Sequence, residues 1–170
     1  MLSKRLGVLA SALVTFAALM PMATASADGG VGTKSVINPP GHYGLANYNS
    51  NKCLAVLANG SHGSRATQTT CGNFDDQSWI VNPEGAITEI RNKYSGKCLT
   101  VQGTADGAPA FQYTCTGLKD QKWYAYHINS SYTWYVNYNS NKCLVVQGKE
   151  EGNAAFQFTC GYWEDQYWAW

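Results

Sequence analysis

The sequence predicts an all-β domain made of three copies of one unit of about 45 residues, closed into a threefold barrel. Cysteine spacing is the first observation: Cys53, Cys98 and Cys143 are separated by 45 and 45 residues, and a second set by 44 and 45. Short β-branched segments separated by glycine turns are the second, and no segment has a helical hydrophobic stripe. Since closure removes exposed strand edges, paired short strands in three equivalent units favour a barrel.

Each unit opens with a turn that leads into a cysteine and a leucine. The stretch NYNSNKCL occurs at 47–54 and again, letter for letter, at 137–144, and the second unit has the looser RNKYSGKCL at 91–99. Such self-similarity at a fixed period indicates a repeat architecture. We expect this stretch to form the entry to the first strand pair of every unit.

Strands are expected on both sides of a glycine-containing turn in each unit. LAVL, LTVQ and LVVQ follow the first cysteine, AFQYTC and AFQFTC alternate with period two, and SHGS, ADGA and EEGN mark the turns. Each unit closes with Asp-Gln-x-Trp: DQSW at 76–79, DQKW at 120–123 and DQYW at 165–168. Residues of core type recur in three equivalent layers: Leu54, Val56, Trp79, Leu99, Val101, Trp123, Leu144, Val146 and Trp168.

Disulfides are expected because six cysteines follow an apparent export signal. Within each unit the two cysteines lie 18, 17 and 17 residues apart. Six cysteines allow fifteen pairings, and the repeat favours those that treat the three units alike: Cys53–Cys71, Cys98–Cys115 and Cys143–Cys160. A metal site is the alternative, but the sequence has no cysteine pair at CxxC spacing.

The chain divides into a signal peptide, a short flexible segment and the three repeats. Residues 1–27 have Lys4 and Arg5 before an apolar run and end in small residues, which predicts a secretory signal peptide and an extracellular protein. A membrane anchor is the competing interpretation, but the run is shorter than the roughly 20 residues that span a bilayer. Residues 28–42 are rich in Gly and Pro and predict a flexible segment. The repeats occupy 43–170, as units of about 43–82, 88–126 and 133–170.

Composition excludes several classes of partner and activity. Two of the twelve basic residues lie in the signal peptide, so the remaining chain has ten basic and eleven acidic residues and is nearly neutral. Neither nucleic acid nor an anionic membrane is therefore favoured as a binding partner. His42, His62 and His127 occupy no equivalent positions and no nucleophile motif, so we expect no catalytic residues and no enzyme. No cofactor, bound metal or membrane insertion is expected either.

Strand parity identifies one surface patch per unit. Side chains two residues apart share a face of a strand, which groups Ala55 with Thr69, Thr100 with Tyr113, and Val145 with Phe158. The aspartates before the closing glutamines, Asp76, Asp120 and Asp165, could fold back towards these patches. An aromatic ring can cover the apolar face of a pyranose while a carboxylate accepts hydrogen bonds from the sugar hydroxyls. The alternative is structural: Tyr113 and Phe158 are ordinary residues of the barrel wall, and the closing glutamines only form hydrogen bonds to the backbone.

The repeated Cys-Leu-x-Val, glycine turn, second cysteine and Gln-x-Trp close resemble the ricin B-type β-trefoil lectin family over 43–170. The resemblance implies a β-trefoil with up to three shallow sugar sites and a glycan or polysaccharide as partner. The style of the signal peptide and its short tail of small and polar residues resemble those of secreted actinobacterial proteins.

The chain departs from the family pattern at the expected sites. Sugar-binding members typically carry aspartate two residues after the first cysteine, where this chain has Ala55, Thr100 and Val145. The aromatic residue that stacks on the sugar in the family is matched by Tyr113 and Phe158 in the second and third units, but the first unit has Thr69 there. The asparagine that precedes the closing glutamine in the family is aspartate in every unit.

Two interpretations follow from these departures. In the first, Asp120 and Asp165 take over hydroxyl recognition, and the third unit is the foremost site, with the second next. In the second, sugar binding is lost and Phe74, Leu118 and Trp163 anchor a secreted protein partner, so that the trefoil is a targeting subunit or an inhibitor. The candidate carbohydrate-binding residues are Phe158, Asp165, Gln166, Trp163, Tyr113, Asp120, Gln121 and Thr100.

Overall fold

The computed structural model describes residues 44–56, 60–81 and 87–169. The predicted signal peptide and the flexible segment at 28–42 lie outside these residues. Within the described part, no helix is long and apolar enough to cross a membrane.

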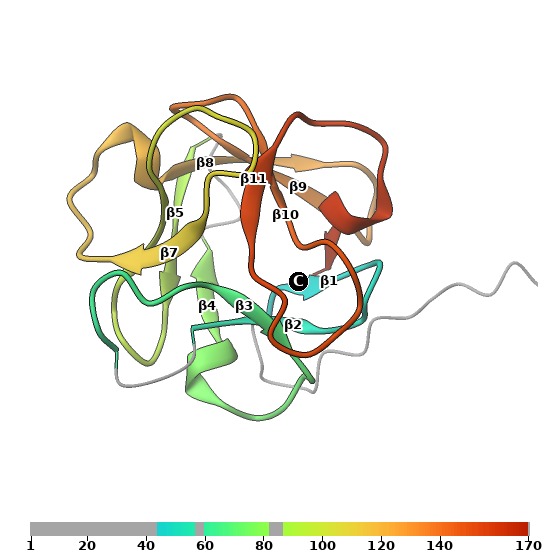
Figure 1. Ribbon diagram of the computed structural model, residues 1–170, viewed down its shortest axis with the longest axis horizontal. Coiled ribbons are helices and arrows are strands. Elements are labelled where there is room, and N and C mark those ends of the chain that lie inside the picture. The colour runs from blue at the N-terminus through green and yellow to red at the C-terminus, as the bar shows by residue number, and fades with distance from the viewer. Residues whose placement is uncertain (1–43, 57–59, 82–86, 170) are drawn as a thin grey trace, which may run out of the picture. The chain divides into compact units, whose positions relative to one another are not determined.

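Twelve short strands and three single-turn 3₁₀ helices make up the described residues (Figure 1). The all-β prediction is therefore confirmed. The first unit contains β1 (Ala46–Asn47), β2 (Cys53–Ala55), β3 (Thr67–Thr69), η1 (Asp75–Gln77) and β4 (Trp79–Val81). The second contains β5 (Thr88–Asn92), β6 (Cys98–Val101), β7 (Ala110–Tyr113), η2 (Lys119–Gln121) and β8 (Lys122–His127). The third contains β9 (Thr133–Asn137), β10 (Cys143–Val145), β11 (Phe156–Phe158), η3 (Glu164–Gln166) and β12 (Trp168–Ala169).

Six of the strands form a closed barrel. Antiparallel pairing runs from β1 through β12, β9, β8 and β5 to β4. A bridge between Gly44 and Ser78, which precede β1 and β4, joins the two ends of this path. The ring of strands thus has no free edge, which confirms the closure predicted from the repeat.

The other six strands form three hairpins, β2–β3, β6–β7 and β10–β11 (Figure 1). A cyclic set of backbone hydrogen bonds joins them: the Ala66 N–H donates to the Ala110 carbonyl at 3.0 Å, Ala110 to Ala155 at 2.9 Å, and Ala155 to Ala66 at 2.8 Å. All three alanines are fully buried. Their small side chains suit a point where three backbones approach one another.

The predicted core layers are confirmed. All nine leucine, valine and tryptophan residues expected there are fully buried. Each closing tryptophan also donates its indole N–H to the carbonyl of its unit's core leucine, from Trp79 to Leu54 at 2.8 Å and from Trp168 to Leu144 at 3.0 Å. The indole bodies fill the barrel while this bond satisfies their one polar atom.

The repeated opening stretch is a tight turn that also holds a neighbouring unit. The Asn47 side chain accepts the backbone N–H groups of Asn49 and Ser50 and donates to the carbonyl of Asp165, 118 residues away, at 2.8 Å. Asn92 and Asn137 make the same contacts to Asp76 and Asp120. Each unit therefore fixes the closing turn of the unit that precedes it in the ring.

The less similar copy of the opening stretch, RNKYSGKCL at 91–99, adopts the same backbone conformation as the other two. Asn51 and Asn141 both have φ of 56°, and the equivalent Gly96 has φ of 66°. Asparagine and glycine are the residues that most readily adopt this left-handed conformation. The change from NSNK to YSGK therefore preserves the turn.

The three disulfides join the cysteines within each unit, as predicted: Cys53–Cys71, Cys98–Cys115 and Cys143–Cys160. The first cysteine of each pair lies on the first hairpin strand, directly across from the residue two places before its partner. Each bridge thus ties the closing turn to the hairpin that supports it.

Candidate functional site

The closing Asp-Gln segments form the 3₁₀ turns η1, η2 and η3, which the sequence analysis did not predict. The glutamine of each turn is buried and bonds backbone on the far side of the loop. The Gln166 amide donates to the Thr159 carbonyl at 2.9 Å and accepts the Gly161 N–H at 2.8 Å, and Gln121 does the same with Thr114 and Thr116. Gln121 and Gln166 therefore shape the turns beside the candidate sites, which agrees with the structural interpretation of these residues.

The third unit carries an open depression of about 530 Å³ beside η3. Its floor includes Val145, from β10, and its wall includes Phe158, from β11. The structure thus brings together Phe158, Trp163, Asp165 and Gln166 of the candidate carbohydrate-binding residues. We call this hollow the third-unit depression, and it is lined by Asn49, Val145, Gln147, Phe158, Tyr162, Trp163, Glu164, Asp165 and Gln166.

Two aromatic side chains meet in this depression. The rings of Phe158 and Trp163 lie 6.2 Å apart with an interplanar angle of 64°, an edge-to-face arrangement. Trp163 remains 51% exposed although it packs on Phe158. Exposed indole and phenyl surface beside a hollow offers contact area to a flat, partly apolar ligand.

The Asp165 carboxylate is the polar group of the depression. Its Oδ1 atom is buried and has no hydrogen-bond partner among the described residues. Burial raises the pKa of the Asp165 carboxyl above its ordinary value. Glu164 adds a second carboxylate to the lining, which contains no lysine, arginine or histidine. Asp165 as a whole is only half-buried, so its carboxylate can still accept a hydroxyl or an amine of a molecule bound in the depression.

The second unit arranges its candidates differently. Tyr113 is 42% exposed, and its ring lies 4.9 Å from the ring of His62, which comes from the first unit. Leu118 occupies the position equivalent to Trp163, so the second unit does not repeat the aromatic pair. The Oδ1 atom of Asp120 is buried without a partner in the described structure, as in Asp165.

Thr100 does not reach the surface, contrary to its place among the candidate carbohydrate-binding residues. The residue is 1% exposed, and its hydroxyl donates to the Cys98 carbonyl at 3.0 Å. The same oxygen accepts the Gln121 amide at 3.2 Å. Thr100 is thus a support for the closing turn, because the hairpin turns this position inward. Ala55 and Val145, its equivalents, are also buried.

The first unit has the least site-like surface. Thr69 stands where the other units have an aromatic ring, and the ring of Phe74 is 61% exposed. The polar side chain of Asp75 is engaged by Lys93 at 2.9 Å. That the third unit is the foremost site stays a prediction.

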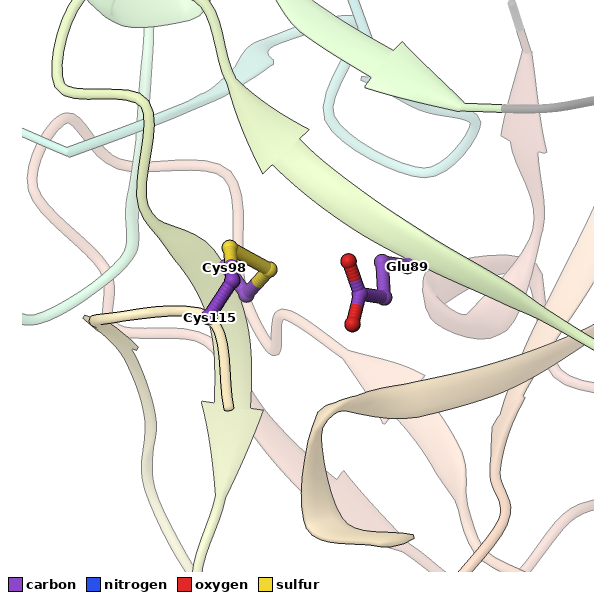
Figure 2. Close-up of side chains that lie close together, drawn as sticks. All are labelled: Glu89, Cys98 and Cys115. Atoms are coloured by element: carbon purple, nitrogen blue, oxygen red, sulfur yellow. A yellow bond between two sulfur atoms is a disulfide. The ribbon is translucent and has the colours of Figure 1, made fainter. Parts of the chain in front are cut away.

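One group of residues has the composition of a metal site. Figure 2 shows Glu89 facing the disulfide of Cys98 and Cys115. The carboxylate and sulfur atoms of these residues lie within 4.8 Å of one another. Both sulfur atoms belong to the disulfide between these cysteines, so neither is a thiolate that could bind a cation.

Four residues that line the third-unit depression were not predicted from the sequence: Asn49, Gln147, Tyr162 and Glu164. Asn49 belongs to the first unit and reaches the third through the Asn47 contact, which no spacing within a unit reveals. Tyr162 is 84% exposed and has Gly117 and Asn73 as its equivalents. An aromatic residue at a position that is polar or small in the other two units was the available signal.

Comparison with known proteins gives a family match. The family model described as "Ricin-type beta-trefoil lectin domain" matches residues 41–168. No curated protein matches the sequence.

Three solved structures show the extent of the likeness. A designed threefold-symmetric protein, ThreeFoil, is 28% identical with a TM-score of 0.72, over 75% of this chain and 95% of its own. The exo-β-1,3-galactanase 1,3Gal43A from Clostridium thermocellum is 27% identical with a TM-score of 0.71, over 78% of this chain. The hemolytic lectin CEL-III is 32% identical with a TM-score of 0.64, over 76% of this chain. The match covers 30% of the length of the galactanase and of the hemolytic lectin.

Proposed function

This chain belongs to the ricin-type β-trefoil lectin family, and from that premise we propose that it is a carbohydrate-binding protein whose main sugar site is the third-unit depression. The observation that carries the proposal is the combination, in one depression, of the Phe158–Trp163 ring pair with the half-buried Asp165 carboxylate. The ring pair contacts the C–H face of a pyranose, and Asp165 accepts a hydroxyl at its edge.

The proposed site differs from the family pattern in its polar anchor. Val145 replaces the aspartate that sugar-binding members typically carry, and it is 1% exposed in the floor of the depression. Asp165 then accepts the hydrogen bonds from sugar hydroxyls in place of that aspartate. Glu164, Asn49 and Gln147 are further polar residues that line the depression. An apolar floor with a carboxylate at one edge favours a sugar that presents one strongly polar edge and one apolar face.

The protein acts by binding in this proposal, without a catalytic step. We also propose that residues 1–27 direct export, so that the domain meets glycans or polysaccharides outside the cell. The likeness to domains within a galactanase and a hemolytic lectin supports a targeting role, since both are named for action on, or recognition of, carbohydrate.

A glycan array followed by titration calorimetry with galactose, lactose and β-1,3-galactan tests the proposal. Binding is expected in the wild type, and Phe158→Ala should weaken it about fivefold, because a ring contact contributes on the order of 1 kcal/mol. Asp165→Ala should weaken it by a similar factor. Tyr113→Ala, the equivalent exchange in the second unit, is the matched control and should leave the main site unchanged.

The outcomes separate the two interpretations. Binding that is unchanged in both Phe158→Ala and Asp165→Ala places the sugar site elsewhere. Failure of every sugar to bind at millimolar concentration refutes the lectin function and favours the protein-partner alternative, in which the exposed Phe74, Leu118 and Trp163 are the anchors.

A further inference from the structure

A cluster of five aromatic side chains lies on the barrel wall next to the third-unit depression. Trp134 on β9 contacts Tyr162 at 5.4 Å between ring centroids and Tyr167 at 6.1 Å. Tyr132 lies 6.4 Å from Tyr167 and 4.6 Å from Tyr48, which is in the first unit. We call this cluster the aromatic wall, and it consists of Tyr48, Tyr132, Trp134, Tyr162 and Tyr167.

The aromatic wall is continuous with the depression. Tyr162 lines the depression and also packs on Trp134 of the wall. From there the rings continue across β9 and β12 to the turn after β1, because the Tyr48 N–H bonds the Tyr167 carbonyl at 2.8 Å. Tyr162 is exposed and the other four wall residues are half-buried, so the aromatic surface that begins at Phe158 and Trp163 extends beyond a single hollow.

The fold itself does not require these aromatic residues, and the other two units are the internal comparison. The neighbouring wall pair Trp134 and Tyr167 corresponds to Glu89 and Lys122 in the second unit. In the first unit the same pair is Gly44 and Ser78, which form the bridge that closes the barrel. Three pairs of unrelated chemistry occupy one structural position, so packing does not explain the aromatic pair.

A contiguous group of aromatic rings that each keep part of their surface in water marks an interaction site more often than an isolated ring does. Four of the five wall residues are tyrosines, whose hydroxyls can bond a polar ligand while their rings contact its apolar face. Aliphatic side chains would instead suit a purely apolar partner. This chemistry matches a chain of sugar rings, in which C–H faces and hydroxyl edges recur along the polymer.

We propose that the aromatic wall is an extended subsite that holds a polysaccharide chain as it leaves the third-unit depression. The inference rests on the proposed function, because the depression would hold one sugar unit and the wall the units that follow. Its consequence is a preference for long glycan chains over single sugars.

Affinity as a function of chain length tests the wall separately from the depression. Titration calorimetry would use mono- to hexasaccharide series of β-1,3-galactose, β-1,4-xylose and chitin. For the series that binds, we expect the hexasaccharide to bind at least about tenfold more tightly than the monosaccharide, since each added ring contact contributes on the order of a few-fold to tenfold.

Variants copied from the other units remove the wall with the least risk to folding. The double exchange Trp134→Glu with Tyr167→Lys reproduces the Glu89 and Lys122 pair, and should abolish the gain with chain length while monosaccharide affinity is retained. Tyr48→Lys reproduces Lys93 and gives a second, milder variant. Tyr138→Lys is the same exchange at the equivalent position of the third unit, where the ring packs on Tyr124 of the second unit and not on the wall, and it should have no effect.

Each outcome decides between the alternatives. A chain-length gain that survives both the double exchange and Tyr48→Lys overturns the inference while the proposed function stands. If the wild-type protein binds no monosaccharide, the proposed function and the inference are both overturned. A dimer, detected by sedimentation, that dissociates in the double variant assigns the wall to a second copy of the chain and also overturns the inference.

Discussion

Replacement of Asn47 by alanine should both destabilise the domain and disturb the third-unit depression. The Asn47 side chain is fully buried, and it makes three hydrogen bonds, at 2.8 Å to the Asp165 carbonyl and at 3.1 and 3.3 Å from two backbone N–H groups. A net loss of about 1 kcal/mol for each bond predicts a decrease of about 3 kcal/mol in the free energy of unfolding. Urea unfolding followed by tryptophan fluorescence measures this decrease.

Two matched variants separate the effect on stability from the effect on the site. Asn92→Ala removes the equivalent contacts to Asp76 and should cost about the same, since its bonds are equivalent. It should leave sugar binding unchanged, whereas Asn47→Ala should weaken it, because the Asn47 amide bonds the Asp165 carbonyl and the Asn92 amide does not. Asn139→Ala, in an exposed position of the third-unit turn, should change stability by less than about 0.5 kcal/mol. Equal stability of the Asn47→Ala and Asn139→Ala variants would refute the reasoning.

Two further predictions concern acid stability and export. Hydrogen bonds from Lys52 and then Thr70 lower the pKa of Glu151 to about 2, so the ionised side chain stabilises the fold above the unfolded pKa of 4.5, and this contribution is lost as pH falls towards 2. The stability of Glu151→Gln should therefore vary less between pH 4.5 and 2 in urea titrations, and parallel curves would contradict the assignment. For export, mass spectrometry of protein from the culture medium should give a chain that starts at Asp28, and an intact residue 1 would contradict cleavage of 1–27.

The fold was predictable because its main signals lie within each unit. Cys53 and Cys71 are 18 residues apart, and Leu54 and Trp79 share a layer, so repetition alone identified the disulfides and the core. The closing of the barrel by Gly44 and Ser78 was predicted only in outline. The asparagine contacts between units were not predicted, since a bond across 118 residues has no local signature.

The candidate site was predictable only in part, because the sequence pattern does not tell which side chains the fold buries. Strand parity correctly placed Val145 and Phe158 together, because alternation of side chains is a local property. Parity does not tell which face is covered, and the hairpins bury Thr100 beside Gln121. Tyr162 lies on a loop, where neither period two nor helical period applies, so no pattern within its own unit identified it.

The repeated stretch at the start of each unit connects the fold to the site in a way its sequence does not reveal. A carboxylate at position 145 would be buried in this chain, since Val145 is 1% exposed, and burying an unpaired charge is costly. Hydroxyl recognition in the proposed site therefore depends on Asp165, whose backbone Asn47 fixes from another unit. Identical copies of the stretch thus have different consequences: Asn137 holds Asp120 in a unit with Leu118 at its rim, whereas Asn47 holds Asp165 beside the ring pair and the aromatic wall. The function of each copy is set by the unit it contacts.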